Sequence, residues 1–570
     1  MKTRLLSIIF TVFALYSCTT GIQEKTTEST VVQISRDPGS LNPIEFLNST
    51  NLMMINLLYQ GLYKIDVTDY KLKPLLVESV AQGEQRGDTV VFNFKLRKEA
   101  QWPDGKVISA KDVAFSLKLL NCPLLNNVNS KPLFNSIRDI RYSDDSPEEF
   151  QLICIGEALP NSFLVGDFPI VPAHIFDRKE MLTEIPLSRF VNDDGSLREN
   201  QAVRGYANFF DGLSADPVNF MGSGPYQLES WIPDQSVKFS RKQNWWADAL
   251  KSDDVVFAAQ PQLIDFQVIP SEQTAVYALK NGTLDVLWSV PTDEFEQLKS
   301  NDQMQKDFHL LTNDTYRISY FGFNGRKSIL DKKTRQALAH LIDKETVIQL
   351  TMKGYAVPTL GFVHPQDPNY NSSISPYSLN PEKAQALLAE AGWAKSDDGW
   401  SRIVDGERET LRLNLSYEGV NEAYENTATI FASNAASIGI EVNLKPMERR
   451  TFFQSLRAHD FDMFIRSKTG GPMAYNFMQF LHSSAAVEGG SNYTAFGTQE
   501  SDSVVHFLAY AYGGDKDKEH VLRFQEIVHE EANMIFLYFS QNRLAVSKRY
   551  QEPVTMMMYP YVDILSLRAN

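Results

Sequence analysis

The hydrophobic pattern of residues 317–352 predicts a strand followed by two helices. In residues 317–323 apolar side chains occupy odd and even positions alike, so that Tyr320 points to one face and Phe321 to the other. A strand that is apolar on both faces is typical of a sheet centre covered on both sides. The helices that follow carry apolar residues three and four positions apart, and Asp343 is placed to cap the second one. We expect the chain to leave one lobe and enter another here.

Other stretches add to this pattern. Residues 89–96 alternate between apolar and polar side chains, which predicts a strand with one buried face. Residues 49–63 predict a helix that ends at Gly61, and residues 262–288 follow the strand, helix, strand order of a βαβ unit. Residues 180–219 are polar and only weakly periodic, and we expect them to form a long excursion over the surface.

The size of the chain requires more than one core. With 570 residues it is too long for a single ordinary domain, and we expect two or three. The composition, 43% apolar and 22% charged, is that of a soluble globular protein, and the net charge of −15 argues against nucleic acid as a partner. Cys122 and Cys154 either pair, as conditions outside the cytoplasm permit, or stay buried as free thiols, and the sequence leaves both open.

The amino terminus has the pattern of a targeting segment. A basic start precedes an apolar run over residues 5–16, which is too short to span a bilayer. The run ends in Leu-Tyr-Ser-Cys, which resembles a bacterial lipobox, so we expect residues 1–17 to be a lipoprotein signal peptide and Cys18 to carry a lipid. The alternative is an ordinary signal peptide with an incidental cysteine. Residues 18–30 are polar and aperiodic, as in a flexible tether, and no other segment has eighteen consecutive apolar residues.

Motifs for catalysis or metal binding are absent from the sequence. It contains no G-x-S-x-G, H-E-x-x-H, C-x-x-C or G-x-x-x-x-G-K-[ST] pattern. The His-Glu-Glu run at residues 529–531 lacks the second histidine of a zinc helix. We therefore expect no enzyme activity, no metal site and no cofactor.

Five motifs occur in an order that is specific, although each is weak alone. They are WPDG with SAKDVAFS at residues 102–116, GSGPY with NWW at 222–246, a run at 324–344 that contains RQA and IDK, NPEKAQALLAEAGW at 380–393, and GIEVNLK with FDM at 439–463. Together they resemble the signatures of the family 5 bacterial extracellular solute-binding proteins, the oligopeptide- and dipeptide-binding receptors of ABC importers. The resemblance extends from about residue 31 to the carboxyl end.

The resemblance implies an α/β architecture of the two-lobed, type II periplasmic-binding-protein kind, with an extra satellite domain in the first lobe. The bounds that it implies are residues 31–62, 217–316 and 535–570 for lobe I, 63–216 for the satellite domain, and 317–534 for lobe II. The crossings between the lobes, near residues 317–324 and 536–543, would form the hinge.

The function that the resemblance implies is that of a receptor. It would bind a small peptide or peptide-like solute between the lobes, close on it, and deliver it to ABC permease subunits. It would be a monomer on the periplasmic side of the cell envelope, held to a bacterial membrane by its lipid. Two other classes stay open: a receptor for a non-peptide solute such as haem, a metal complex or a sugar, and an extracellular hydrolase on a receptor fold. The absence of a nucleophile motif argues against the hydrolase.

The segment after the FDM strand departs from the family pattern. Peptide binders of this family carry a tryptophan there, and then an aspartate that pairs with the ammonium group of the peptide. Here Arg466 stands near the tryptophan position and Lys468 or Thr469 near the aspartate position; Pro472 matches a final proline, and no acidic residue occurs before Tyr475. We expect Arg466 or Lys468 to meet a carboxylate or another anionic group. The alternative is that both face solvent and that another carboxylate serves the ligand.

Three residues near the predicted lobe crossing are further candidates for ligand contact. Trp288 follows a predicted strand, Tyr320 lies on the crossing strand and Asn324 ends it. The full candidate set for ligand binding is Arg466, Lys468, Thr469, Tyr475, Trp288, Asn324 and Tyr320.

Overall fold

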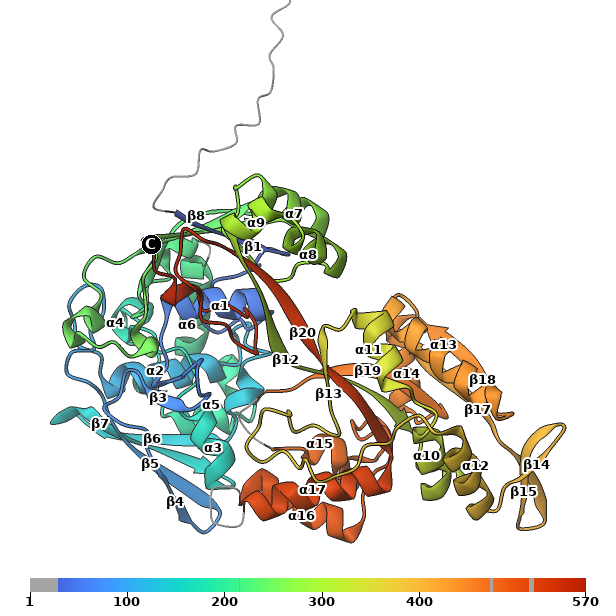
Figure 1. The fold of residues 1–570 in the computed structure, drawn as a ribbon. Coiled ribbons are helices and arrows are strands. Elements are labelled where there is room, and N and C mark those ends of the chain that lie inside the picture. Colours follow the sequence, from blue (N-terminus) through green and yellow to red (C-terminus); the bar gives the residue numbers. More distant parts are fainter. Residues whose placement is uncertain (1–28, 215, 472–474, 512–516) are drawn as a thin grey trace, which may run out of the picture.

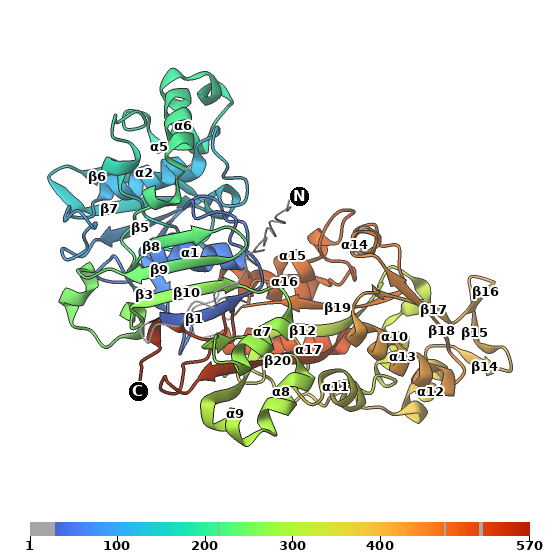
Figure 2. The ribbon, with the colours of Figure 1, turned by 90° about the horizontal axis from the view of Figure 1, so that it is seen from above.

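Two long antiparallel strands, β12 (Phe308–Phe323) and β20 (Met534–Ser547), run from one half of the molecule into the other (Figure 1). This computed structural model describes residues 29–214, 216–471, 475–511 and 517–570, which form two lobes joined by the strand pair (Figure 2). Phe308 lies opposite Ser547 in the first lobe, and Tyr320 lies opposite Phe536 in the second. The strand predicted at residues 317–323 is therefore the second half of β12.

Both strands belong to one continuous sheet. Its strand order is β18-β17-β19-β12-β20-β11-β1-β10-β9-β8, with β13 paired to β20. We call the half with β11, β1, β10, β9 and β8 lobe I, and the half with β19, β17 and β18 lobe II. The bounds are β1 (Ser29–Ile34), β8 (Tyr226–Ile232), β9 (Ser236–Arg241), β10 (Leu263–Val268), β11 (Val286–Leu287), β13 (Ala356–Pro358), β17 (Arg412–Glu418), β18 (Glu441–Met447) and β19 (Met463–Thr469).

Lobe I contains the predicted βαβ unit. Strands β10 and β11 both pair in parallel with β1, and α7 (Glu272–Lys280) connects them. The hydroxyl of Ser271 caps α7 by accepting a hydrogen bond from the N–H of Thr274 (3.3 Å). Two short helices, α8 (Thr292–Lys299) and α9 (Asp302–Asp307), lead from this unit into β12. The pattern of residues 262–288 is confirmed.

A separate four-stranded sheet lies beside lobe I. Its order is β4-β5-β7-β6, and the alternating pattern of residues 89–96 is confirmed because Val90, Phe92, Phe94 and Leu96 are buried. Its core is continuous with that of lobe I. The elements of this region are β2 (Tyr63–Ile65), β3 (Leu72–Pro74), β4 (Gly83–Arg86), β5 (Thr89–Lys95), β6 (Ile137–Ser143), β7 (Ser146–Ile155), α2 (Ala110–Asn121), α3 (Ala158–Leu164), α4 (Ala173–Phe176), α5 (Leu187–Val191) and α6 (Gln201–Ser214).

The surface excursion expected for residues 180–219 is wrong. Helix α6 buries Val203, Tyr206 and Phe210 in the core, and the ring of Tyr206 packs edge-on against Phe115 with the centroids 6.0 Å apart. These apolar residues have the three- and four-residue spacing of a helix face. The polar residues between them hide this spacing in the sequence.

Helices cover both faces of the sheet in lobe II. Phe321 and Phe323 pack among α10–α13 on one face, whereas Ile318 and Tyr320 pack among α14–α17 on the other, which confirms a central strand apolar on both sides. A small sheet, β14-β15-β16, extends from this lobe. The bounds are α10 (Lys332–Ala339), α11 (Lys344–Met352), α12 (Pro381–Glu390), α13 (Glu422–Ser437), α14 (Arg449–Arg457), α15 (Met478–Leu481), α16 (Gln499–Tyr510), α17 (Asp517–Glu531), β14 (Ala394–Ser396), β15 (Gly399–Val404) and β16 (Glu407–Thr410).

The two cysteines of the described residues do not pair. Cys122 and Cys154 are both buried free thiols. Burial raises the pKa of Cys122 to about 11 and that of Cys154 to about 12, so both stay protonated and unreactive at neutral pH.

The end of α1 (Ser49–Leu58) is enclosed by the GSGPY and NWW motifs. The N–H of Gly224 donates to the carbonyl of Leu58 (2.9 Å), and a Cβ built on Gly224 would lie only 2.3 Å from the carbonyl oxygen of Leu57. The Trp245 indole donates to the carbonyl of Ser223 (2.9 Å). Glycine is required here because two backbones touch, and the contact fixes α1 against lobe I.

We predict that Gly224→Ala lowers the free energy of unfolding by about 2 kcal/mol or more, because the added methyl group overlaps backbone that has no room to move. The matched control is Gly212→Ala in α6, where a Cβ meets nothing within 4 Å, so its stability should stay the same or rise slightly. The shift of the urea midpoint measures both. Equal midpoints for the two variants would contradict the close approach.

Candidate functional site

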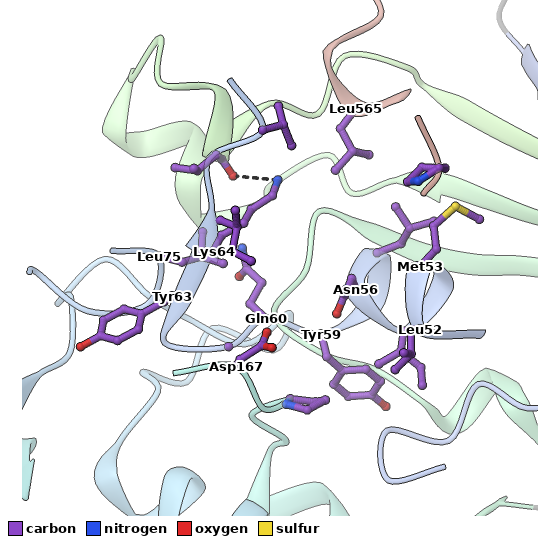
Figure 3. Close-up of a pocket in the computed structure, with 18 of the residues that line it drawn as sticks. Leu52, Met53, Asn56, Tyr59, Gln60, Tyr63, Lys64, Leu75, Asp167 and Leu565 are labelled. Carbon is purple, nitrogen blue, oxygen red and sulfur yellow. Dashed lines mark hydrogen bonds between the residues drawn. The ribbon is translucent and has the colours of Figure 1, made fainter. Parts of the chain in front are cut away.

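A cavity of about 500 Å³ lies in lobe I between α1, the β2–β3 hairpin, the turn at residues 166–169 and the carboxyl-terminal segment at residues 556–565 (Figure 3). This volume is in the range of small-molecule binding pockets. Most of its lining is apolar.

One face of α1 lines the cavity. Ser49, Leu52, Met53 and Asn56 have the helical spacing that places them on this face, and none of the four is buried. The opposite face of α1 packs into the lobe I core. The helix predicted at residues 49–63 is confirmed, but it ends at Leu58 rather than at Gly61.

The carboxyl-terminal segment forms the cavity wall nearest the strand pair. The amide of Asn313, on β12, donates to the carbonyl of Met556. The N–H of Met557 donates to the hydroxyl of Tyr70 (2.7 Å), and the ring of Tyr559 packs edge-on against Trp288, with centroids 5.5 Å apart. This wall is therefore attached to the strands that join the lobes.

A close crossing of two chain segments directs Asp167 into the cavity. The N–H of Tyr63 donates to the carbonyl of Gly166 (3.1 Å), and a Cβ built on Gly166 would lie 2.1 Å from the Tyr63 ring. Asp167 follows this crossing, lines the cavity and is exposed within it. Burial raises the pKa of Asp167 to about 6. Among the described residues no hydrogen bond or ion pair reaches its carboxylate.

The opposite wall carries a cation that already has acidic neighbours. The ammonium group of Lys64 donates to the carbonyl of Val256 (3.3 Å) (Figure 3). Burial lowers the pKa of Lys64, and the carboxylates of Asp563, Asp254 and Asp66 counteract this effect. Three charged residues line the cavity: Lys64 lies near Asp563, whereas Asp167 is paired with no base among the described residues.

The strand pair is irregular where it passes between the lobes. Asp314 pairs with Gln541 and Ile318 with Phe539, so that three residues of β12 bulge opposite Ser540. The hydroxyl of Thr315 donates to the carbonyl of Ser540 (2.7 Å) across this bulge. A bulge interrupts the ladder and permits local bending.

Lobe II reaches the rim of the cavity at this bulge. The ring of Tyr316 lies edge-on to that of Tyr70, with centroids 6.1 Å apart, and its carbonyl accepts a hydrogen bond from the N–H of Gly470 (2.8 Å). A Cβ built on Gly471 would lie 4.0 Å from the sulfur of Met558 in the cavity wall. The end of β19 therefore lies beside the lobe I cavity.

The lobes also touch away from the strand pair. The Tyr355 ring packs edge-on against Phe295 of α8 with centroids 5.7 Å apart, and its hydroxyl donates to Glu296. Lys353 forms an ion pair with Asp293. Helix α16 of lobe II lies against α3 beside lobe I (Figure 1).

Arg466 and Lys468 lie together in lobe II, and Tyr320, which the sequence groups with Trp288 and Asn324, lies beside them. Arg466 pairs with Tyr320 across β12 and β19, and its guanidinium lies over the ring of Phe453 at 5.1 Å. The Lys468 ammonium lies 3.1 Å from the centroid of Phe480. Burial, and then the charge of Arg466, lower the pKa of Lys468 to about 8. In the described ranges the buried Nε of Arg466 has no hydrogen-bond partner.

The other candidate residues are dispersed. Trp288 is 4% exposed within lobe I, and Asn324 is buried with its amide donating to the carbonyls of His459 (2.9 Å) and Phe461 (3.0 Å). Thr469 is exposed at the end of β19, and the hydroxyl of Tyr475 donates to Asp367 (2.6 Å). A ligand contact at any of the seven candidates stays a prediction.

Some predicted features fall outside the described residues. Cys18, most of the tether and Pro472 are among them. In the parts that the structure describes, no three His, Cys, Asp or Glu side chains are grouped so that they could hold a metal ion. Over the same parts, no helix has both the length and the apolar character needed to cross a membrane.

Sequence reasoning missed Asp167 and the exposed face of α1. A single aspartate before Phe168 and Pro169 carries no motif. Its place in the cavity depends on Gly61 and Gly166, which cross closely although they are distant in sequence. Only the helical spacing of polar Ser49 and Asn56 within an apolar helix gives a local signal for the lining face.

The chain resembles known proteins over most of its length. The family described as bacterial extracellular solute-binding proteins, family 5 Middle, matches residues 71–488. The oligopeptide-binding protein AppA of Bacillus subtilis (strain 168) is 24% identical over 529 residues, or 90% of this chain and 87% of that protein. The dipeptide-binding protein of Escherichia coli (strain K12) is 23% identical over 517 residues, or 88% of each.

A solved structure supports the architecture. HbpA2 from Haemophilus parasuis superposes with a TM-score of 0.74 at 20% identity, and the match covers 95% of this chain and 100% of that one. The predicted α/β fold of the two-lobed periplasmic-binding-protein kind is confirmed.

Proposed function

The chain belongs to the bacterial extracellular solute-binding proteins, family 5, and from this premise we propose that it is an ABC-importer receptor for a peptide or peptide-like solute. The family consists of binding receptors, not enzymes. Relatives named as oligopeptide- and dipeptide-binding proteins match nearly the whole chain, which supports a peptide-like solute. Delivery to permease subunits by a monomer is part of the same proposal.

The observation that carries the proposal is the contact between the lobe I cavity and lobe II at a strand bulge. The cavity is large enough for a small solute, and the end of β19 lies at its rim. The bulge at residues 315–317 is the point at which the lobes can rotate. We also propose the domain bounds expected from the sequence, with residues 63–216 as a satellite domain of lobe I.

Ligand binding should make the molecule more compact, because the two lobes rotate about the bulge to enclose the solute. A solute that binds with a Kd of about 1 μM has a binding free energy of only about −8.2 kcal/mol, so closure itself must require little free energy. Only a solute with better contacts in the closed form drives the rotation.

The test begins with mass spectrometry of ligand that co-purifies with the protein. The radius of gyration is then measured by small-angle scattering, with and without that ligand at saturation. A smaller radius is expected, and an unchanged radius with proven binding would reject closure. If the ligand is neither a peptide nor peptide-like, the proposed solute class is wrong.

We propose that Arg466 and Lys468 bind an anionic group of the solute. In the described ranges no carboxylate pairs with either cation, and partly desolvated cations without an anion are unfavourable. Aromatic rings hold both side chains in place from one side. The sequence offers no acid between Arg466 and Tyr475, so an ammonium group finds no partner in this segment.

Arg466→Ala should weaken binding of a peptide with a free carboxylate by about 1.5–3 kcal/mol, the usual contribution of a charged hydrogen bond. For the same peptide with an amidated carboxyl end, Arg466→Ala should change the binding free energy little. Calorimetric titration measures both, with the exposed Arg450→Ala on α14 as the matched control. Unchanged binding of the free-carboxylate peptide by Arg466→Ala would contradict the proposal.

We propose that Cys18 carries the lipid that holds the protein at the membrane surface. The tether expected for residues 18–30 is too long by at least two residues, because Ser29 and Thr30 are buried in β1. Acyl chains contribute about 0.8 kcal/mol of membrane affinity for each buried CH₂ group. The extracellular character of the family agrees with this location.

Cys18→Ala should move the protein from the membrane fraction to the soluble fraction without changing its unfolding midpoint. The neighbouring Thr20→Ala is the control and should stay with the membrane. Fractionation after a carbonate wash measures both, and a Cys18→Ala protein that remains in the membrane fraction would rule out lipidation at this residue.

A further inference from the structure

The lobe I cavity has an unbalanced charge. Lys64 is near Asp563, Asp254 and Asp66, and its ammonium group has a carbonyl acceptor. The carboxylate of Asp167, in contrast, is exposed within the cavity and has no hydrogen bond or ion pair among the described residues. A carboxylate on a mostly apolar cavity wall attracts a cation, because an ammonium group bound there exchanges water for a charged partner.

The rest of the cavity has the character of a site for an apolar group. Leu52 and Met53 line it from α1, and Met558 and Leu565 line it from the carboxyl-terminal segment. Methionine side chains adapt to ligands of different shape. A volume of about 500 Å³ accepts a large side chain together with the backbone that carries it.

The cavity lies where a solute in the cleft can enter it. Tyr70 at its rim contacts Tyr316 of the bulge, and Gly471 of lobe II approaches Met558 in its wall. Lobe II presents the opposite charge, with Arg466 and Lys468 near the end of β19. The two lobes therefore offer a carboxylate on one side and two cations on the other.

We propose that the lobe I cavity is the subsite for an ammonium group carried on an apolar body, with Asp167 as its counter-ion. The inference rests on the proposed function, because it assigns the cationic, apolar part of the solute to lobe I and leaves the anionic part to lobe II. Asp167 of lobe I would then serve the ammonium group in place of the acid that is absent between Arg466 and Tyr475.

The test uses 2-phenylethylammonium as the probe and its neutral N-acetyl derivative as the matched compound. Both are titrated into the full-length protein, and binding is followed by calorimetry and ligand-observed NMR. The charged probe should bind at least tenfold more tightly than the neutral one. Anomalous scattering from crystals soaked with 2-(4-bromophenyl)ethylammonium should place the bromine between α1 and the carboxyl-terminal segment.

Two variants and one control complete the experiment. Asp167→Asn should remove the preference for the charged probe, and Asp211→Asn, an exposed acid on α6, should leave it unchanged. Asn56→Trp fills the cavity from the exposed face of α1 and should abolish binding of both probes. If Asp167→Asn does not fold, Asn56→Trp and the bromine position in the wild-type protein decide.

The outcomes separate this inference from the proposed function. Equal affinity for the two probes, no binding of either, an unchanged preference in folded Asp167→Asn, or bromine outside the cavity would each overturn the subsite. If peptides bind and make the protein more compact but the probe gives one of these results, the proposed subsite is wrong and the proposed receptor function is supported. If the probe binds as expected and no peptide binds, the peptide assignment is wrong and the subsite is supported.

Discussion

The pairing of β12 with β20 is the interaction on which the two-lobed structure depends. These strands carry one sheet from lobe I into lobe II, so each lobe is built onto the same hydrogen-bonded ladder. The ladder is interrupted at two places, near residues 315–317 between the lobes and by a register shift next to Tyr320 within lobe II. Only the first lies outside the covered part of the sheet. Rotation of the lobes, as proposed, would concentrate there, because bending elsewhere would break ladder bonds that are shielded from water.

The charged side chains on the two sides of this bulge have opposite signs. Among the described residues, Asp167 in lobe I pairs with no cation, and the partly buried Arg466 and Lys468 in lobe II pair with no anion. A fold selected for stability alone would pair such groups or replace them with apolar residues. Unpaired charges of opposite sign in the two lobes fit a protein whose missing partners come with the solute. A solute bound as proposed would supply partners to charges in both lobes.

The elements set by local pattern could be predicted from the sequence. The two-sided apolar run at residues 317–323, the alternation at 89–96 and the cap of Asp343 depend on residues close in sequence, and the structure has each of them. Helix α6 was missed because polar residues dilute its apolar face.

Most of the candidate site depends on contacts between distant segments, and these leave no local signal. Asp167 enters the cavity because Gly61 and Gly166 cross, and the cavity wall closes because Asn313 and Tyr70 hold the carboxyl-terminal segment. The GSGPY motif is visible as a string of residues, but the sequence does not reveal that Gly224 makes room for the end of α1. Motifs therefore identify the family more readily than they locate its ligand.

The attachment of the cavity wall links occupancy of lobe I to the angle between the lobes. The amide of Asn313, next to the bulge, donates a hydrogen bond to the carbonyl of Met556. The hydroxyl of Tyr70 accepts one from the N–H of Met557, and the Tyr70 ring contacts Tyr316 within the bulge. Rotation at the bulge must move this wall with β12 or break these contacts. A group that fills the cavity in only one wall position then favours one lobe angle, because it binds one of the two forms more tightly. On this argument a solute bound in lobe I as proposed would affect the strands that join the lobes, because the cavity wall is attached to them.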